Sequence, residues 1–207
     1  MYLKKFKELH SRLKKRSDIE IHSFKIGDKL SKSAIKQILK NQELPSDVLD
    51  FYEQLNGFQL SYTFKNNLHF KKDEFGHYDQ AFPYMLPNDH YWQLDGCINI
   101  LPLDFMVNKN WQDYIWFDYP YDNKVKYKGS LVSEHEFEKE LFPFDVFCKC
   151  SIVAIHFDKD CSSILLSTDH NACYFDYRPL NFKNYIDGIL EMDGLIDNRE
   201  KIFKVYM

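Results

Sequence analysis

The first residues of the chain place apolar and charged positions with the period of an α-helix. Leu3, Phe6, Leu9 and Leu13 recur every three or four residues, and lysine and arginine occupy most of the remaining surface. We therefore predict an amphipathic, basic helix over residues 1–16. Its apolar stripe is narrow, which favours docking on the rest of the chain, with only a modest loss of stability expected if the helix is deleted. A membrane-surface or nucleic-acid adaptor acting through this helix is an alternative.

A second helix is predicted after residue 30. Ser31 can cap its N-terminus, and Ile35, Ile38 and Leu39 fall on one face before the pattern ends near Asn41.

The third predicted helix has clearer boundaries. It opens at Leu44-Pro45, because proline suits the first helical position, and Asn56-Gly57 ends it, because glycine readily adopts a left-handed backbone conformation. Its apolar positions repeat at helical spacing, namely Val48, Phe51, Tyr52 and Leu55.

Alternation of apolar and polar residues then indicates strands. Residues 58–64 are typical of a half-buried strand, and 98–103 form a short apolar run. Residues 65–94 show no sustained period and are interpreted as a long insert. Further along the chain we predict a strand at 114–118, a helix at 133–141, and an antiparallel meander at 151–157, 163–167 and 172–177.

A last helix is predicted between Pro179 and Gly194, with Phe182, Tyr185 and Ile189 among its buried positions. Helices thus flank a group of strands. This order indicates an α+β fold, in which helices from both ends of the chain pack on a central, mostly antiparallel sheet. The 207 residues suit a single domain, 1–207, since no stretch has the composition of a flexible linker.

Composition adds an expectation about the compartment. The 5 cysteines are odd in number and irregularly spaced, which is unlike a secreted disulfide framework. No apolar run is long enough to cross a bilayer. We therefore expect a soluble, cytoplasmic protein that does not act at a membrane.

The charge is distributed unevenly. Residues 1–16 hold 7 basic side chains and 1 acidic one, so that 17–207 carry 20 basic and 30 acidic residues, a net charge of -10. Such a body repels nucleic acid and would attract a basic protein surface.

Two stretches resemble motifs of the SUKH superfamily, which includes fungal cell-wall-synthesis regulators and bacterial immunity proteins. One is Leu44-Pro45 through Asn56-Gly57, followed by an apolar strand. The other is Gly96-Cys97-Ile98-Asn99-Ile100-Leu101-Pro102-Leu103, similar to the Gly-x-x-x-(Ile/Leu)-x-Pro-Leu strand exit of that family. The resemblance covers residues 31–193. The chain departs from it in having Tyr62 where the family often has tryptophan, and in the insert at 65–94.

The resemblance implies a binding scaffold, commonly an immunity protein that holds a toxin in an inactive complex. We therefore expect a non-catalytic protein-binding domain with no cofactor. On physical grounds the motif residues Leu44, Pro45, Asn56, Gly57, Leu101 and Pro102 are structural, because they begin and end secondary structure.

The enzymatic alternative uses residues in the C-terminal half. A metal-dependent hydrolase or nucleotide-modifying enzyme could draw on Cys148, Cys150, His156, Asp158, Cys161, His170 and Cys173. Cys148 and Cys150 have only one residue between them, a poor spacing for two ligands of one zinc ion. Buried thiols are the favoured interpretation, so we predict neither a metal site nor a catalytic residue.

The segment 111–122 is the candidate contact surface. Asp118, Tyr119, Tyr121 and Asp122 surround Pro120, which favours a loop. Tyrosines bury a large area at low entropic cost, and the aspartates could steer a toxin with a basic surface.

Overall fold

The computed structural model describes residues 1–40, 42–70, 94–108, 124–127, 130–133, 141–147, 151–158, 161–168, 180–199 and 201–202. The helices of this part are α1 (Tyr2–Lys14), α2 (Lys32–Leu39), α3 (Ser46–Tyr52), α5 (Leu103–Val107) and α7 (Phe182–Glu191), with the 3-10 turn η3 (Ile196–Asn198). The strands are β1 (Ile19–Ile26), β2 (Phe58–Phe64), β3 (Gly96–Ile100), β4 (Lys124–Tyr127), β5 (Ser130–Ser133), β6 (Leu141–Val146), β7 (Ser151–Asp158) and β8 (Cys161–Thr168).

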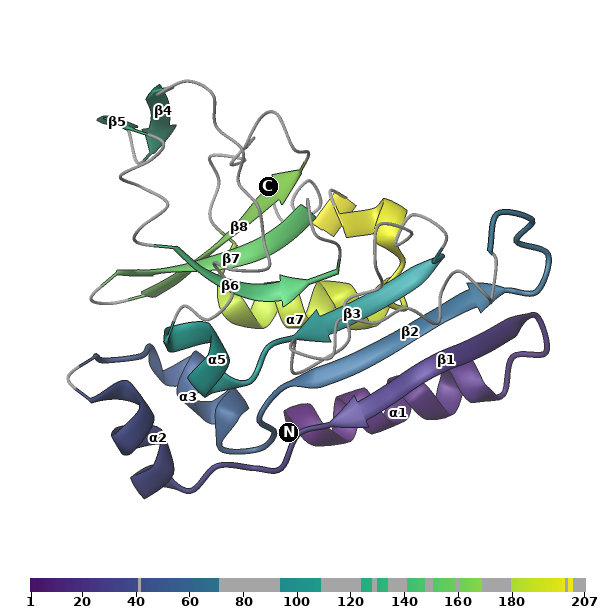
Figure 1. Ribbon diagram of the computed structural model, residues 1–207, viewed down its shortest axis with the longest axis horizontal. Coiled ribbons are helices and arrows are strands. Elements are labelled where there is room, and N and C mark those ends of the chain that lie inside the picture. The colour runs from purple at the N-terminus through teal and green to yellow at the C-terminus, as the bar shows by residue number, and fades with distance from the viewer. Residues whose placement is uncertain are drawn as a thin grey trace.

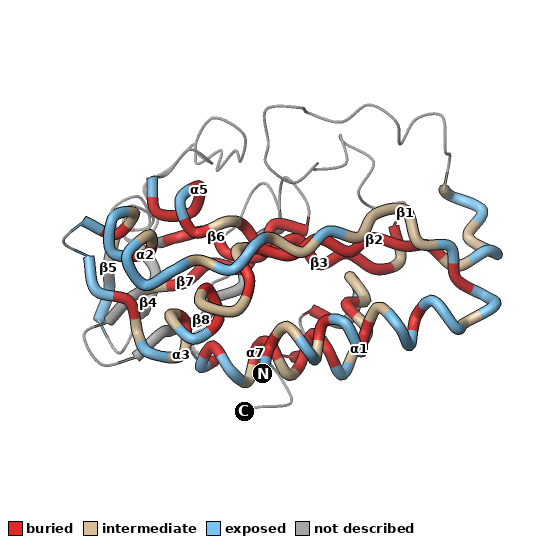
Figure 2. The backbone as a smooth tube through the Cα atoms, turned by 90° about the horizontal axis from the view of Figure 1, so that it is seen from below, coloured by how far each residue is buried: buried red, intermediate tan, exposed pale blue. Residues whose placement is uncertain are grey.

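Six strands form one sheet in the order β1-β2-β3-β6-β7-β8, and every neighbouring pair is antiparallel (Figure 1). Strands β4 and β5 form a separate two-stranded hairpin. Helices α1 and α7 lie on the same side of the sheet (Figure 2). The predicted α+β class with a central antiparallel sheet is confirmed.

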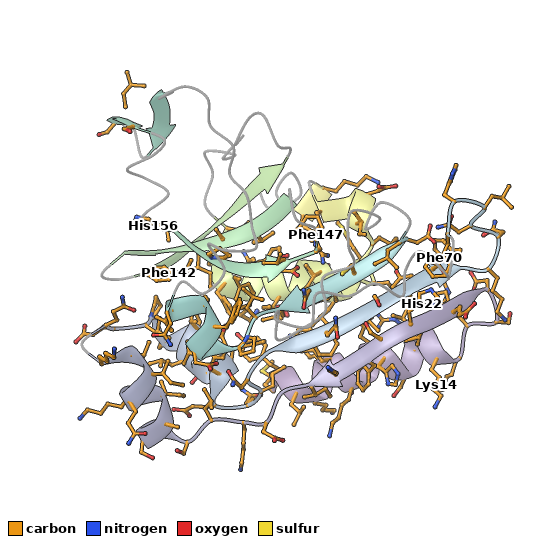
Figure 3. All side chains as sticks on the ribbon, viewed as in Figure 1. Lys14, His22, Phe70, Phe142, Phe147 and His156 are labelled. Carbon is orange, nitrogen blue, oxygen red and sulfur yellow. The ribbon has the colours of Figure 1, made fainter. Side chains whose placement is uncertain are left out.

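Helix α1 is docked on the sheet through its apolar stripe. Tyr2, Phe6, Leu9 and Leu13 are buried, and the ring centroids of Phe6 and Phe58 lie 4.2 Å apart. Lys14 on the opposite side extends away from the sheet (Figure 3). The docked arrangement predicted from the narrow stripe is confirmed. So much buried apolar surface now predicts a larger loss of stability on deletion than the modest one expected from the sequence.

The predicted starts of α2 and α3 are confirmed at their caps, whereas the predicted end of α3 at Asn56-Gly57 is wrong, because the helix already ends at Tyr52. Ser31 Oγ accepts a hydrogen bond from Ala34 N at 3.2 Å. Helix α3 begins directly after Pro45, and Gly57 lies beyond its end with φ of 91°. A positive φ of this size favours glycine, as the sequence predicted.

Strand β2 is buried on both faces, and the prediction of a half-buried strand is therefore wrong. Its polar residues Gln59, Ser61 and Thr63 are at most 4% exposed. Strand β1, which the sequence pattern did not predict, supplies partners: Ser23 Oγ lies 2.6 Å from Ser61 Oγ, and His22 Nε2 lies 2.8 Å from Thr63 Oγ1. The His22 ring also stacks on Phe70 at 4.4 Å (Figure 3).

Two other predicted elements need correction. Ser133 ends β5 and Leu141 begins β6, so a helix over 133–141 is wrong at both ends, and 134–140 lie outside the described residues. The apolar residues from Phe142 onward alternate with the period of a strand, and they are buried in the core. The apolar run at 98–103 also divides: β3 ends at Ile100, and Leu103 begins α5.

The meander is confirmed for two of its three strands, since β7 and β8 pair as an antiparallel hairpin. The predicted strands at 114–118 and 172–177 lie outside the described residues, as does most of the insert at 65–94. Helix α7 buries Phe182, Tyr185 and Ile189 as predicted, and Gly194 follows it with φ of 71°.

Candidate functional site

The two motifs that resemble the SUKH superfamily contact each other in the fold. The Tyr52 hydroxyl, from the end of α3, donates a hydrogen bond to the main-chain oxygen of Leu101 at 3.0 Å, across 49 residues of sequence. Both residues are fully buried. The end of the first motif is thereby fixed to the strand exit of the second.

Asn56 makes the second connection between these motifs. Its Oδ1 accepts a hydrogen bond from Leu103 N at 2.8 Å, which pairs one of the main-chain donors at the start of α5. Pro102 directly precedes that helix. Asn56 and Gly57 therefore lie in the turn between α3 and β2, and Pro102 lies at the start of α5.

A buried ionic cluster lies further along the sheet and was not predicted. Arg199 Nη2 is 3.0 Å from Asp145 Oδ2, and these side chains are 2% and 0% exposed. The same oxygen accepts a hydrogen bond from the Tyr185 hydroxyl at 2.6 Å, and Asp145 Oδ1 accepts one from Asn99 N at 2.8 Å. Arg199 also donates to the main-chain oxygen of Cys97.

The geometry of the sheet explains why a carboxylate is needed there. Strands β3 and β6 pair only at Ile100 and Asp145, and β6 has an irregular register between Pro143 and Asp145. The chain after α7 occupies the edge of β3 instead, with a hydrogen bond from Cys97 N to Gly194 O at 3.0 Å. The Asp145 side chain therefore takes over an acceptor role at the point where the ladder between β3 and β6 stops.

The electrostatics of this cluster favour a structural role over proton transfer. Burial, with the nearby Asp145 carboxylate, raises the pKa of Tyr185 well above its ordinary value. Burial raises the pKa of the Cys97 thiol to about 12, so at neutral pH it is protonated and a poor nucleophile. Burial opposes the charge of Arg199, yet Tyr185 and Asp145 raise its pKa overall.

Sequence reasoning missed this cluster because its members are remote from one another. The one local signal is an aspartate inside the apolar run Phe142-Pro143-Phe144-Asp145-Val146-Phe147. A carboxylate buried in such a strand requires a partner. The guanidinium carbon of Arg199 also lies 5.0 Å from the centroid of the Phe147 ring.

The structure describes only some of the residues that were considered as metal ligands. Cys148, Cys150, His170 and Cys173 lie outside the described residues, and the strand register pairs Asp158 with Cys161, the end of β7 with the beginning of β8. His156 is half-buried on β7. Within the described ranges, no three His, Cys, Asp or Glu side chains gather closely enough to hold a metal ion.

The predicted contact residues Asp118, Tyr119, Tyr121 and Asp122 also lie outside the described residues, so their contact role stays a prediction. Among the helices that the structure describes, none is long and apolar enough to cross a membrane.

No protein family, curated protein or solved structure matches this chain.

Proposed function

We propose that this protein is a non-catalytic protein-binding domain, and specifically a bacterial immunity protein that neutralises a cognate toxin by direct binding. The proposal rests on the resemblance of residues 31–193 to the SUKH superfamily.

The junction of the two motifs supports this proposal. The Tyr52–Leu101 and Asn56–Leu103 hydrogen bonds join the two stretches that resemble the superfamily. Strand β2, which follows the first motif, pairs with β3 of the second, so both motifs belong to one continuous scaffold.

The charge distribution favours a basic partner. Residues 17–207 carry a net charge of -10, which would steer a basic toxin into contact. The proposed contact residues are Asp118, Tyr119, Tyr121 and Asp122. Their type suits an interface with aromatic anchors and long-range electrostatic attraction.

The decisive experiment uses the product of the gene immediately upstream, because an immunity protein is expected beside its toxin. We expect expression of that product alone to arrest growth, and co-expression of this protein to restore it through a stable complex. An upstream product that is harmless, or that does not bind the purified protein, would contradict the proposal.

Variants of the proposed contact residues then test where the toxin binds. Asp118→Lys with Asp122→Lys should slow association and weaken its dependence on salt, whereas Tyr119→Ala and Tyr121→Ala should mainly speed dissociation. Both sets should leave the melting temperature nearly unchanged. Tyrosine variants that unfold the protein would show that these rings belong to the core.

A further inference from the structure

A groove of about 1010 Å³ runs beside α1, on the side of the helix that does not face the sheet. Lys7, Ser11 and Lys15 follow one another along it at intervals of four residues, which places them on one face of the helix. Lys29, from the connection before α2, and Glu53, from the end of α3, line it too.

The groove has an excess of positive charge. Of its two acidic residues, Glu8 lies 3.7 Å from Lys4, and Glu53 lies 3.7 Å from Lys32. Arg12 forms an ion pair with Asp193 at the end of α7.

Three other lysines line the groove without such partners. Lys7, Lys15 and Lys29 have no carboxylate within ion-pair distance in the part of the chain that the structure describes. Their three ammonium groups are therefore available to an anionic ligand.

A membrane surface is a poor occupant for this groove. A basic amphipathic helix binds a bilayer by inserting its apolar face, but Phe6, Leu9 and Leu13 are at most 1% exposed because they fill the core. Only the charged side of α1 is accessible.

A nucleic acid also fits poorly. Its phosphates would meet Glu8 and Glu53 in the groove, and beyond residue 16 the chain is strongly acidic. A polypeptide suits this mixture better, because its main-chain N–H groups can donate to those carboxylates while its own acidic side chains meet the lysines.

We propose that this groove binds an extended, acidic segment of a protein partner. The helical rise places Lys7 and Lys15 about 12 Å apart along α1. In an extended chain, side chains at i and i+4 on one side are separated by about 13 Å. Acidic residues at those two positions would therefore meet both lysines, and an apolar residue of the segment could contact Leu3, which is partly buried. The inference rests on the proposed function only in that the occupant belongs to a protein.

The direct test measures fluorescence anisotropy of a labelled short peptide in which glutamate alternates with leucine, at low ionic strength. We expect binding by the full chain, none with the same peptide carrying glutamine in place of glutamate, and progressive loss as salt is added. The variant Lys7→Glu with Lys15→Glu should weaken binding by about tenfold or more, because each change replaces an attraction with a repulsion.

The matched control is Lys25→Glu with Lys36→Glu, which makes the same change in net charge at exposed lysines away from the groove. It should bind nearly as well as the wild type. Equal losses in both variants, or no binding of the glutamate peptide, would overturn the proposal. Tighter binding of single-stranded DNA or phosphatidylserine vesicles through Lys7 and Lys15 would overturn it as well, in favour of those ligands.

A second measurement separates this inference from the proposed function. The two double variants are compared for their affinity to the upstream gene product. If that product binds both variants and the wild type equally, the groove is not its contact surface, so the proposed function stands and the peptide measurement alone decides the inference. If the product does not bind at all but the peptide does so selectively, the proposed function fails and the groove remains a peptide site.

Discussion

Asp145 and Arg199 form an ion pair at 3.0 Å that is almost completely removed from solvent. Removing one partner of such a pair leaves a buried charge without compensation, which costs about 3–5 kcal/mol. We therefore expect Arg199→Met to lower the free energy of unfolding by about that amount in urea denaturation. The double variant Asp145→Asn with Arg199→Met should be clearly more stable than the sum of the two single changes predicts.

The double-mutant cycle can also contradict the prediction that Asp145 and Arg199 act as a pair. Additive effects would mean that Asp145 and Arg199 contribute independently and that the pair is not a unit. Tyr185→Phe serves as a milder comparison, since it removes one hydrogen bond to Asp145 and should cost about 1–3 kcal/mol.

Gly188, inside α7, is in close contact with Ile202 beyond the helix. A Cβ at position 188 would lie 2.6 Å from Ile202 Cγ2. In an ordinary helix, exchange of glycine for alanine stabilises by about 1 kcal/mol, but here we expect Gly188→Ala to destabilise. Adding Ile202→Ala should relieve the clash, so that Gly188→Ala becomes favourable in that background. Thermal melts of the four proteins decide the sign, and a stabilising Gly188→Ala alone would show that Ile202 moves freely.

Gly57 has a φ of 91°, a conformation that a β-branched residue strongly disfavours. We expect Gly57→Val to lower the free energy of unfolding by at least about 1–2 kcal/mol, and Gly57→Asn to cost less, because asparagine tolerates left-handed conformations better. Equal effects of the two changes in chemical denaturation would assign the loss to side-chain crowding instead of backbone conformation.

Helix α1 should behave as part of the core. Leu9 is 1% exposed, and truncating a leucine at such a site costs about 2–5 kcal/mol, so Leu9→Ala should lower the urea midpoint substantially. Lys7→Ala, on the exposed side of the same helix, is the control and should change stability little. A small effect of Leu9→Ala would restore the expectation of a helix that contributes only modestly.

His10 should give stability a dependence on mildly acidic pH. It stacks on Phe24 with ring centroids 3.6 Å apart, and burial, together with nearby Lys14, lowers its pKa below 6.5. The unfolded chain therefore takes up the proton at higher pH than the folded one. Stability is fully present above pH 6.5 and declines as the pH falls toward the folded pKa. The variant His10→Gln should flatten this slope in urea titrations, and an unchanged slope would contradict the assignment.

Asp187 should affect stability in a lower range of pH than His10. Burial alone would raise its pKa, but hydrogen bonds from Lys5 and Lys183 lower it overall from 3.8. Its contribution to stability is lost only as the pH falls below that ordinary value. Urea titrations over a range of pH can therefore distinguish the loss of stability due to His10 from that due to Asp187.

The sequence by itself determined the elements whose signals are local. The Ser31 cap, the start of α3 after Pro45 and the glycine turn at position 57 depend on residues a few positions apart. The buried faces of α1 and α7 follow from helical spacing in the same way. These features appeared in the structure as predicted, except that α3 ends at Tyr52 and Gly57 lies in the turn before β2 instead of at the helix end.

Other features were decided only by contacts between remote residues. Strand β1 escaped prediction because an irregularity between Ile21 and Ser23 interrupts its alternation, and pairing with β2 is what stabilises it. The helix predicted at 133–141 was wrong at both ends because two apolar residues at helical spacing cannot reveal how the neighbouring chain pairs.

The functional surfaces likewise depend partly on local sequence and partly on contacts between remote residues. Composition identified the basic character of residues 1–16, but the groove exists only because docking of α1 brings Lys7 and Lys15 near Lys29 and Glu53. Asp145 likewise acquires its partner only when the segment after α7 returns to the edge of β3. The spacing of residues along the sequence predicts local conformation. It cannot reveal an ion pair between residues that are remote in the sequence and meet only in the folded structure.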